Sequence, residues 1–278
     1  MYVAKYVDDM TMIETVRHDV DTDIRNDASI PHHTFEPTLS ASAFNIIKNK
    51  AESKGLKIND AKTQLLSVSS GNYTTEAFLK MDTGEKITSD NELKMLGFSF
   101  STKPNVGLQV ENIIKKANKR FFVLLRYKRA GLPTSRLKDV YTSVMRSCLE
   151  YCSPVYHPQL AQYQIDLLEK IQKRCLRMIY GYDKEYQELL NISGLSSLEE
   201  RRTSQFGKFA NSTVKNPKYH HWFPPNNSLR KGRHTLKYLE ETSKGNRLYK
   251  SPLFAMRRYL NQSEDYIDVD LAELFHIP

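Results

Sequence analysis

The spacing of apolar residues changes near residue 105, and this change constrains the fold more than any other feature of the 278-residue chain. Before it, apolar residues form short runs of strand length that are separated by polar turns. After it, they recur every three to four positions, which is the period of an amphipathic helix. Leu160–Tyr180 shows that period most clearly. The sequence therefore predicts an α+β fold: a hairpin, a helix and short strands, followed by a mainly α-helical remainder.

The same patterns place individual elements. Residues 1–14 indicate a hairpin, Arg17–Pro37 a polar loop or an insertion, and residues 211–252 a basic stretch of poor periodicity. Helices are predicted over Leu39–Ser53, Val110–Ala130, a stretch starting at Thr134 or Ser135, Leu160–Tyr180, and a stretch after a capping box from Ser196 to Glu199. Strands are predicted over residues 64–69, 79–81 and 96–100.

Charge is distributed unevenly along the chain, which carries a net charge of +9. Residues 1–38 hold eight acidic and three basic side chains, whereas residues 110–150 hold three acidic and ten basic ones. Residues 201–260 hold two acidic and fourteen basic side chains. An acidic segment followed by basic ones suits a metal site beside surfaces that bind a polyanion. The alternative is that the lysines only solubilise the surface.

Two adjacent aspartates, Asp8 and Asp9, lie between the apolar stretches Tyr2–Val7 and Met10–Ile13. An Asp pair between strand-like runs predicts a tight hairpin with both carboxylates at its tip. Neighbouring carboxylates repel each other, and shared divalent cations relieve that repulsion. Carboxylate oxygens suit Mg²⁺ or Mn²⁺. An ordinary polar turn is the alternative interpretation of this pair.

Tyr6-Val7-Asp8-Asp9 resembles the Tyr-X-Asp-Asp box of reverse transcriptases, and further motifs follow in the family's order. These are Gly55-Leu56-Lys57-Ile58-Asn59 with Lys62-Thr63, Leu96-Gly97-Phe98, Leu149-Glu150-Tyr151-Cys152-Ser153-Pro154-Val155-Tyr156, and Gln172-Lys173-Arg174-Cys175-Leu176-Arg177-Met178-Ile179. The last two resemble the thumb region of non-LTR (LINE-type, Jockey-like) retrotransposon polymerases. The resemblance runs from residue 1 to about residue 180, and more loosely to about residue 260.

The resemblance implies roles for the residues that match. Asp8 and Asp9 would hold the metal ions of two-metal nucleotidyl transfer, and Lys62 would lie near the leaving pyrophosphate. Tyr6-Val7 would lie near the primer end, and Leu96-Gly97-Phe98 would form the primer grip. Each of these roles has an alternative interpretation. Tyr6 would be an ordinary strand aromatic, and Lys62 a solvated lysine. The primer-grip residues would be a generic strand fragment.

The resemblance also implies a domain order: a partial palm over residues 1–105, a helical thumb over 106–182 and a basic C-terminal region over 183–278. In the family, the third metal-binding carboxylate and the fingers precede the hairpin, and this sequence begins at the hairpin. We therefore expect a fragment of an RNA-directed DNA polymerase that is inactive alone. The alternative is a non-catalytic nucleic-acid-binding remnant.

One helix face, formed by Lys115, Lys116, Lys119 and Arg120, is basic. In the family such a helix follows the backbone of the template–primer duplex, so the expected partners are an RNA template and a DNA primer. The alternative is a solvated face. No run of 18 apolar residues exists, so no membrane span is expected, and nothing in the sequence indicates a protein partner. A retrotransposon protein is expected inside the cell, in nucleus and cytoplasm.

Overall fold

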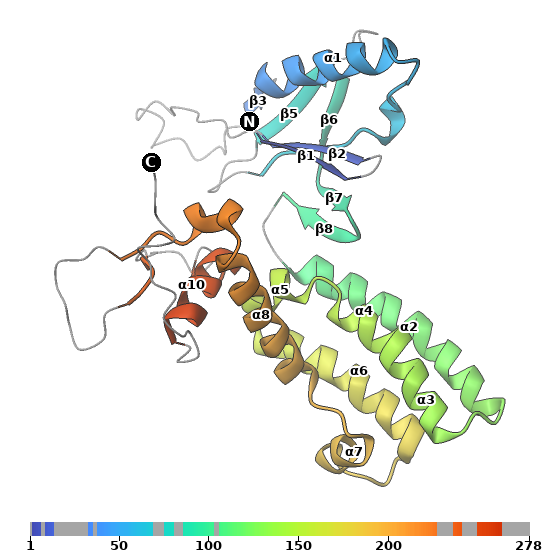
Figure 1. The fold of residues 1–278 in the computed structure, drawn as a ribbon. Coiled ribbons are helices and arrows are strands. Elements are labelled where there is room, and N and C mark those ends of the chain that lie inside the picture. The colour runs from blue at the N-terminus through green and yellow to red at the C-terminus, as the bar shows by residue number, and fades with distance from the viewer. Residues whose placement is uncertain are drawn as a thin grey trace, which may run out of the picture. The chain divides into compact units, whose positions relative to one another are not determined.

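The computed structural model describes residues 2–6, 9–13, 33–35, 38–68, 75–80, 86–102, 106–226, 236–240 and 249–262. Helices and small sheets both occur (Figure 1), so the chain is a mixed α+β protein, as the sequence predicts. The chain divides into two compact units, residues 1–108 and 109–278. In the described residues, the first unit contains the strands and the second is almost entirely helical.

Short strands dominate the first unit. They are β1 Tyr2–Tyr6, β2 Asp9–Ile13, β3 His33–Phe35, β4 Leu65–Leu66, β5 Thr75–Lys80, β6 Lys86–Asp90, β7 Glu92–Met95 and β8 Phe98–Ser101. β1 pairs with β2 and β7 pairs with β8, each pair antiparallel, and a four-stranded sheet has the order β3-β5-β6-β4. Within that sheet β5 and β6 are antiparallel, while β3 and β4 run parallel to their partners. The hairpin predicted over residues 1–14 is therefore confirmed.

One long helix, α1 Thr38–Glu52, accompanies the four-stranded sheet (Figure 1) and confirms the predicted helix over Leu39–Ser53. Gly55 follows it with a φ of +71°, and its amide donates to the Glu52 carbonyl at 2.9 Å. Glycine adopts this left-handed conformation without Cβ strain, which ends the helix cleanly. A short 3₁₀ turn, η2 Asp60–Lys62, comes next.

Two predictions about the strands were wrong. The stretch predicted as a loop, Arg17–Pro37, contains the strand β3, which carries no periodic signal because it has only three residues and depends on pairing with β5. The strand predicted over residues 96–100 begins at Phe98. Leu96 and Gly97, with φ of +48° and +81°, form the two-residue turn between β7 and β8. Positive φ at both positions is what a tight hairpin of this kind requires.

Helices form the second unit. They are α2 Gly107–Arg129, α3 Thr134–Val140, the π-helical turn η3 Tyr141–Arg146, α4 Ser147–Glu150, α5 Ser153–Tyr156, the 3₁₀ turn η4 His157–Gln159, α6 Gln162–Tyr180, α7 Tyr186–Ser193, α8 Leu198–Val214, the 3₁₀ turn η5 Pro217–Trp222 and α10 Pro252–Gln262. The helices predicted over Val110–Ala130 and Leu160–Tyr180 are confirmed. Gly131, with a φ of +83°, closes the first of them.

The helix predicted to start at Thr134 or Ser135 exists, but neither residue caps it, since Pro133 holds the cap position. Helical periodicity places Val144 on the apolar side with Leu137, Tyr141 and Cys148, whereas the structure buries Met145. The π-helical turn explains this shift, because its i to i+5 hydrogen bonds insert an extra residue into the turn. The face that contacts the core is therefore displaced by one position.

The core face of α6 also differs from its prediction. Helical periodicity places Tyr163 and Leu167 on the apolar side with Leu160 and Ile171, but they are 64% and 39% exposed. Gln164 and Gln172 are buried instead. The Gln164 side chain accepts from the Ala161 amide at 3.0 Å and so satisfies the helix start. Gln172 joins three other elements, as described below.

The region after α6 contains more packed structure than its composition suggests. The capping box is real but lies one residue later than predicted, with Ser197 and Glu200 bonding each other's backbone amides. A hydrophobic cluster then connects α8, η5 and α10 through buried residues Phe206, Ala210, Val214, Phe223, Tyr238, Ala255, Met256 and Leu260. Val214, Phe223 and Tyr238, which belong to the basic stretch of poor periodicity, therefore pack in a hydrophobic core.

Candidate nucleic-acid interface

The N-terminal hairpin places the aspartate pair at its turn. Tyr6 at the end of β1 is paired with Asp9 at the start of β2, so the connection consists of residues 7 and 8. Val7 and Asp8 lie outside the described residues, and Tyr6 and Asp9 are placed by their backbone alone. Asp9, the second aspartate of the pair, therefore lies at the start of β2, directly after this connection.

The other residues assigned to the polymerase chemistry lie elsewhere in the first unit. Lys62 ends η2 and is exposed, and its amide donates to the Asn59 carbonyl at 3.0 Å. Leu96 and Gly97 form the tip of the β7–β8 hairpin, and Phe98 begins β8. Among the described residues, no three His, Cys, Asp or Glu side chains gather to hold a metal ion.

The basic residues of α2 divide between its surface and its packing side. Lys115, Lys116 and Lys119 are exposed, and Lys115 lies 4.0 Å from the Glu111 carboxylate. Arg120 points the other way: its Nη1 donates to the Val144 carbonyl at 2.6 Å. Arg120 therefore ties α2 to the π-helical turn, and it is not part of the exposed basic row.

The exposed row on α2 contains further residues that were not predicted from the sequence. The buried side of α2 consists of Val110, Ile113, Ala117, Phe121 and Leu124, together with Gln109. On the opposite side, positions 115, 119, 122 and 126 follow one another at steps of four, three and four residues, which keeps them in one line along a helix. They are Lys115, Lys119, Phe122 and Arg126, and all are exposed. The same spacing in the sequence could have revealed Phe122 and Arg126.

A second line of exposed residues runs beside the first on α2. It contains Lys116, Val123 and Tyr127, and Arg129 is exposed at the end of the helix. Phe122 is 61% exposed, Tyr127 43% and Val123 42%. We call the residues of the two lines, together with Arg129, the α2 face. It combines cations with exposed rings, which is a common composition for surfaces that bind nucleic acid.

Contacts on the packing side fix the orientation of the α2 face. The Lys128 ammonium donates to the Met178 carbonyl of α6. The Arg174 guanidinium, also from α6, lies 3.9 Å from the centre of the Phe121 ring. Together with the Arg120 bond, these contacts hold α2 against η3 and α6, so that the α2 face is directed to solvent.

Glu150 links three helices of this unit. It accepts from Arg201 Nε at 2.5 Å and Arg201 Nη2 at 3.0 Å, and from Gln205 Nε2 at 2.7 Å. Gln205 in turn accepts from the Ser153 hydroxyl at 2.6 Å. These bonds join α4 and α5 to α8, and Arg146 adds a second cation 3.8 Å from Glu150. The motif around Glu150 therefore serves to hold the helices together.

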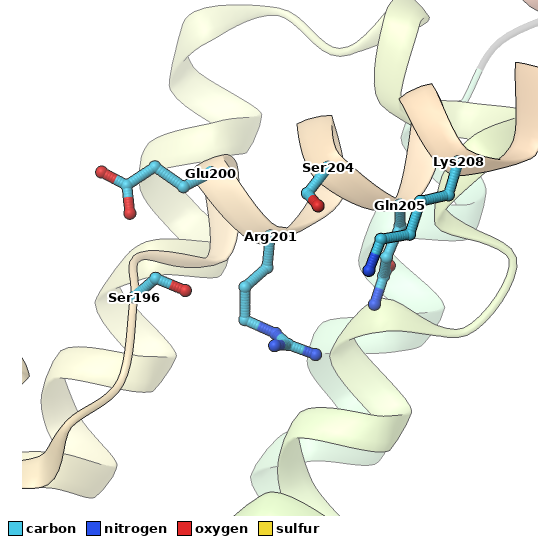
Figure 2. Close-up of a pocket in the computed structure, with 6 residues that line it drawn as sticks. All are labelled: Ser196, Glu200, Arg201, Ser204, Gln205 and Lys208. Carbon is cyan, nitrogen blue, oxygen red and sulfur yellow. The ribbon is translucent and has the colours of Figure 1, made fainter. Parts of the chain in front are cut away.

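Figure 2 shows a shallow hollow on α8 that holds about 280 Å³ and is lined by Ser196, Glu200, Arg201, Ser204, Gln205 and Lys208. Arg201, Gln205 and Lys208 lie on the same side of the helix. Since Glu150 and the capping box already occupy Arg201, Gln205 and Glu200, Lys208 contributes the remaining charge of the hollow. The side chains that line this hollow therefore stabilise the packing of the helices.

Gln172 is a second polar link. Its carbonyl accepts from the Tyr141 hydroxyl, and its amide donates to Tyr186 at 2.9 Å and to the Ser196 carbonyl at 3.0 Å. The nearby Glu169 was expected to pair with Lys173, but it accepts from the Tyr186 hydroxyl and from the Leu198 amide at 3.1 Å. Burial raises the pKa of Tyr141 and Tyr186 above the usual value, so both stay protonated donors.

Burial shifts two further groups between α5 and α8. Desolvation, together with the nearby Arg202 guanidinium, lowers the pKa of His157 to about 4. Arg202 itself is fully buried, and within the described chain its side-chain nitrogens have no hydrogen-bond partner. Burial lowers its pKa as well. His157 Nε2 lies 3.2 Å from the Thr203 hydroxyl. A neutral imidazole is therefore part of the packing here.

In the sequence, the stretch Met256-Arg257-Arg258-Tyr259 combines cations with an aromatic residue, a composition that predicts contacts with single-stranded RNA, but its first two residues are buried. Arg257 donates from Nε to the Trp222 carbonyl at 2.8 Å, and Arg258 lies 3.7 Å over the Tyr249 ring. Tyr259 packs edge-on against Phe206. This part of α10 therefore stabilises the hydrophobic cluster. The second such stretch, residues 230–233, lies outside the described residues.

Comparison with known proteins finds no matching family model, no matching curated protein and no matching solved structure. Among the described residues, none of the helices combines the length and the apolar character that crossing a lipid bilayer needs.

Proposed function

We propose that this chain is a nucleic-acid-binding part of an RNA-directed DNA polymerase of the non-LTR retrotransposon type. The resemblance of its motifs, in order from the Tyr-X-Asp-Asp box onward, supports the polymerase assignment. In this proposal residues 1–105 belong to the palm, residues 106–182 form the thumb, and residues 183–278 form a C-terminal region that packs on it. Its partners are an RNA template and a DNA primer.

The α2 face is the observation that carries the proposal. Lys115, Lys119 and Arg126 lie in one line on the side of α2 opposite its core, with Lys116 beside them and Arg129 at the helix end. Glu111 is the acidic residue near them, and it pairs with Lys115 at 4.0 Å. A row of exposed cations on a rigid helix matches the regular spacing of phosphates along a nucleic-acid backbone.

The hairpin carries the catalytic part of the proposal. Asp8 and Asp9 supply carboxylate oxygens, the donors that Mg²⁺ and Mn²⁺ prefer, and the two residues are adjacent in the chain, with Asp9 at the start of β2. When bound, the metal pair would support in-line attack of a primer 3′-hydroxyl on a nucleotide α-phosphate. Tyr6 would buttress the hairpin, and Lys62 would neutralise the leaving pyrophosphate.

Nucleic-acid binding is tested by its dependence on salt. A triple variant, Lys115→Gln, Lys119→Gln and Arg126→Gln, removes three candidate phosphate contacts and keeps good helix formers. Each contact contributes about 0.7 to 0.9 to the slope of log affinity against log salt, so the slope should flatten by about 2 to 3. Lys50→Gln, Lys54→Gln and Lys57→Gln at the end of α1 remove the same charge elsewhere and form the control. Binding that is equally salt-dependent in both variants would contradict this placement.

The catalytic assignment needs a separate experiment. In the family the third metal-binding carboxylate lies upstream of the hairpin, so the test uses a polymerase in which this chain follows an upstream palm and fingers. Asp8→Asn or Asp9→Asn should abolish primer extension on an RNA template, since each removes a metal-binding charge worth several kcal/mol in the transition state. Asp90→Asn in β6 is the matched control. Full activity of the hairpin variants would leave a nucleic-acid-binding remnant as the better description.

A further inference from the structure

Phe122 occupies an unusual position for a large apolar side chain. It lies in the line of Lys119 and Arg126, directly opposite the buried side of α2, and 61% of it is exposed. Tyr127 and Val123 extend the apolar surface beside it, at 43% and 42% exposed. Single exposed apolar residues are common, but three of them on one basic helix face, one in the first line and two in the second, are a feature of binding surfaces.

The charges around these rings indicate what kind of partner would bind to them. Lys119 precedes Phe122 by three residues and Arg126 follows it by four, so a cation lies about one turn away on each side. Arg126 directly precedes Tyr127 in the chain, and Arg129 follows it by two residues at the end of the helix. A partner must therefore offer negative charges at intervals, with flat apolar faces between them. Nucleic acid has this composition.

The exposed rings distinguish an unpaired strand from a duplex. In a duplex the flat faces of the bases are hidden in the stack, and a side chain lying along the backbone meets only phosphate and sugar. In an unpaired strand the base faces are free to stack on aromatic side chains. Phe122 and Tyr127 are five residues apart, which separates them by about 7.5 Å along the helix axis and by about 140° around it, so they would receive bases from different nucleotides.

We propose that the α2 face binds an unpaired RNA or DNA strand, with bases stacked on Phe122 and Tyr127 and phosphates bound by Lys119, Arg126 and Arg129. This inference rests on the proposed function and deepens it, because it names the kind of nucleic acid that the face selects. The cations supply affinity for any nucleic acid, and the rings supply the preference for an unpaired strand. No base sequence is selected, since every base has a flat face.

The test compares three ligands with equal numbers of phosphates: an unpaired oligonucleotide, an unpaired strand whose central nucleotides lack bases, and a duplex. Phe122→Leu and Tyr127→Leu keep an apolar side chain and a good helix former but remove the ring. By fluorescence anisotropy, each should weaken binding of the unpaired oligonucleotide about fivefold or more. Affinity for the abasic strand and for the duplex should change by less than about twofold, since their contacts are with phosphates.

Tyr163→Leu on α6 is the matched control, since Tyr163 is also an exposed aromatic, at 64%. It should leave all three affinities unchanged. Equal losses for the unpaired and duplex ligands, or no loss in the ring variants, would overturn the stacking inference while leaving the salt-dependent binding intact. Self-association of the wild-type chain that Phe122→Leu abolishes, measured by sedimentation, would also overturn it, because the rings would then cover a second copy.

Discussion

The two units of this protein are stabilised by different means. In the described residues up to 102, strands of two to six residues form separate small sheets, and where side chains are described as well, the buried hydrophobic ones are Phe44, Ala77 and Leu79. In the described residues from 106 onward, long helices bury continuous apolar stripes. Glu150 and Gln172 also connect helices that are far apart in the sequence. This difference indicates that the helical unit holds its surface side chains more rigidly than the strand-rich unit does.

That difference matters for the proposed function. The α2 face is held by contacts to η3 and α6, so its cations and rings have a defined spacing. The Asp8-Asp9 turn depends on a two-stranded hairpin, and an isolated hairpin of this kind has little stability of its own. Binding through the α2 face should therefore survive conditions that disturb the hairpin.

The largest expected effect is a cavity in the helical unit. Leu168→Ala removes a fully buried side chain from α6 and should lower the free energy of unfolding by about 2 to 5 kcal/mol. Its neighbour Leu167 is 39% exposed, so Leu167→Ala should cost about 1 kcal/mol or less. Urea unfolding followed by circular dichroism measures both. Equal losses would show that α6 does not pack as described.

A polar link should matter less than the core but more than a surface pair. Glu150→Gln breaks the paired hydrogen bonds to Arg201 and should cost about 2 kcal/mol, less than a fully buried pair because the Arg201 side chain is 32% exposed. Glu111→Gln is the control, since the pair of Glu111 with Lys115 is 66% and 70% exposed and is worth about 0.5 kcal/mol or less. The same unfolding experiment decides. If Glu150→Gln lowers the free energy of unfolding no more than the control does, Glu150 does not link the helices.

Acid should weaken the contact between α5 and α8. The pKa of His157 is lowered from 6.5 to about 4, so below pH 6.5 the unfolded chain binds a proton that the folded chain does not. The contribution of His157 to stability is therefore fully present above pH 6.5 and is lost as the pH falls towards 4. His157→Gln should reduce the dependence of the unfolding free energy on pH in that window. An unchanged pH dependence in the variant would show that the imidazole titrates normally.

The smallest expected effect lies in the strand-rich unit and would be a gain. Leu96 adopts a φ of +48° in the turn between β7 and β8, a conformation that Asn tolerates better than Leu. Leu96→Asn should stabilise the hairpin by about 0.5 kcal/mol, whereas Gly97→Ala, at a φ of +81°, should destabilise it by about 1 kcal/mol. Amide hydrogen exchange of β7 and β8 reports both changes. A destabilising Leu96→Asn together with a stabilising Gly97→Ala would contradict the described turn.

Local patterns were enough to predict several elements from the sequence. The N-terminal hairpin, α1 with its glycine stop, α2 and α6 lie where strand-like runs, helical periodicity and end signals predict them. These signals succeed because they describe interactions between residues that are close in the chain. Helical spacing also predicts the exposed line on α2. The predicted basic face ended at Lys119 and Arg120, whereas the exposed line continues to Arg126 and excludes Arg120.

Only the tertiary structure decided which polar groups are buried and which apolar ones are exposed. Arg120 turns inward because the Val144 carbonyl is there to accept its hydrogen bond, and Gln172 is buried because Tyr141, Tyr186 and Ser196 satisfy it. Arg257 lies inside for the same reason, beside the Trp222 carbonyl. Burying a polar group is favourable only when its partners are present, and those partners come from distant parts of the chain. Periodicity therefore predicted the helices of this protein, while their packing determined which of their side chains remain available to a ligand.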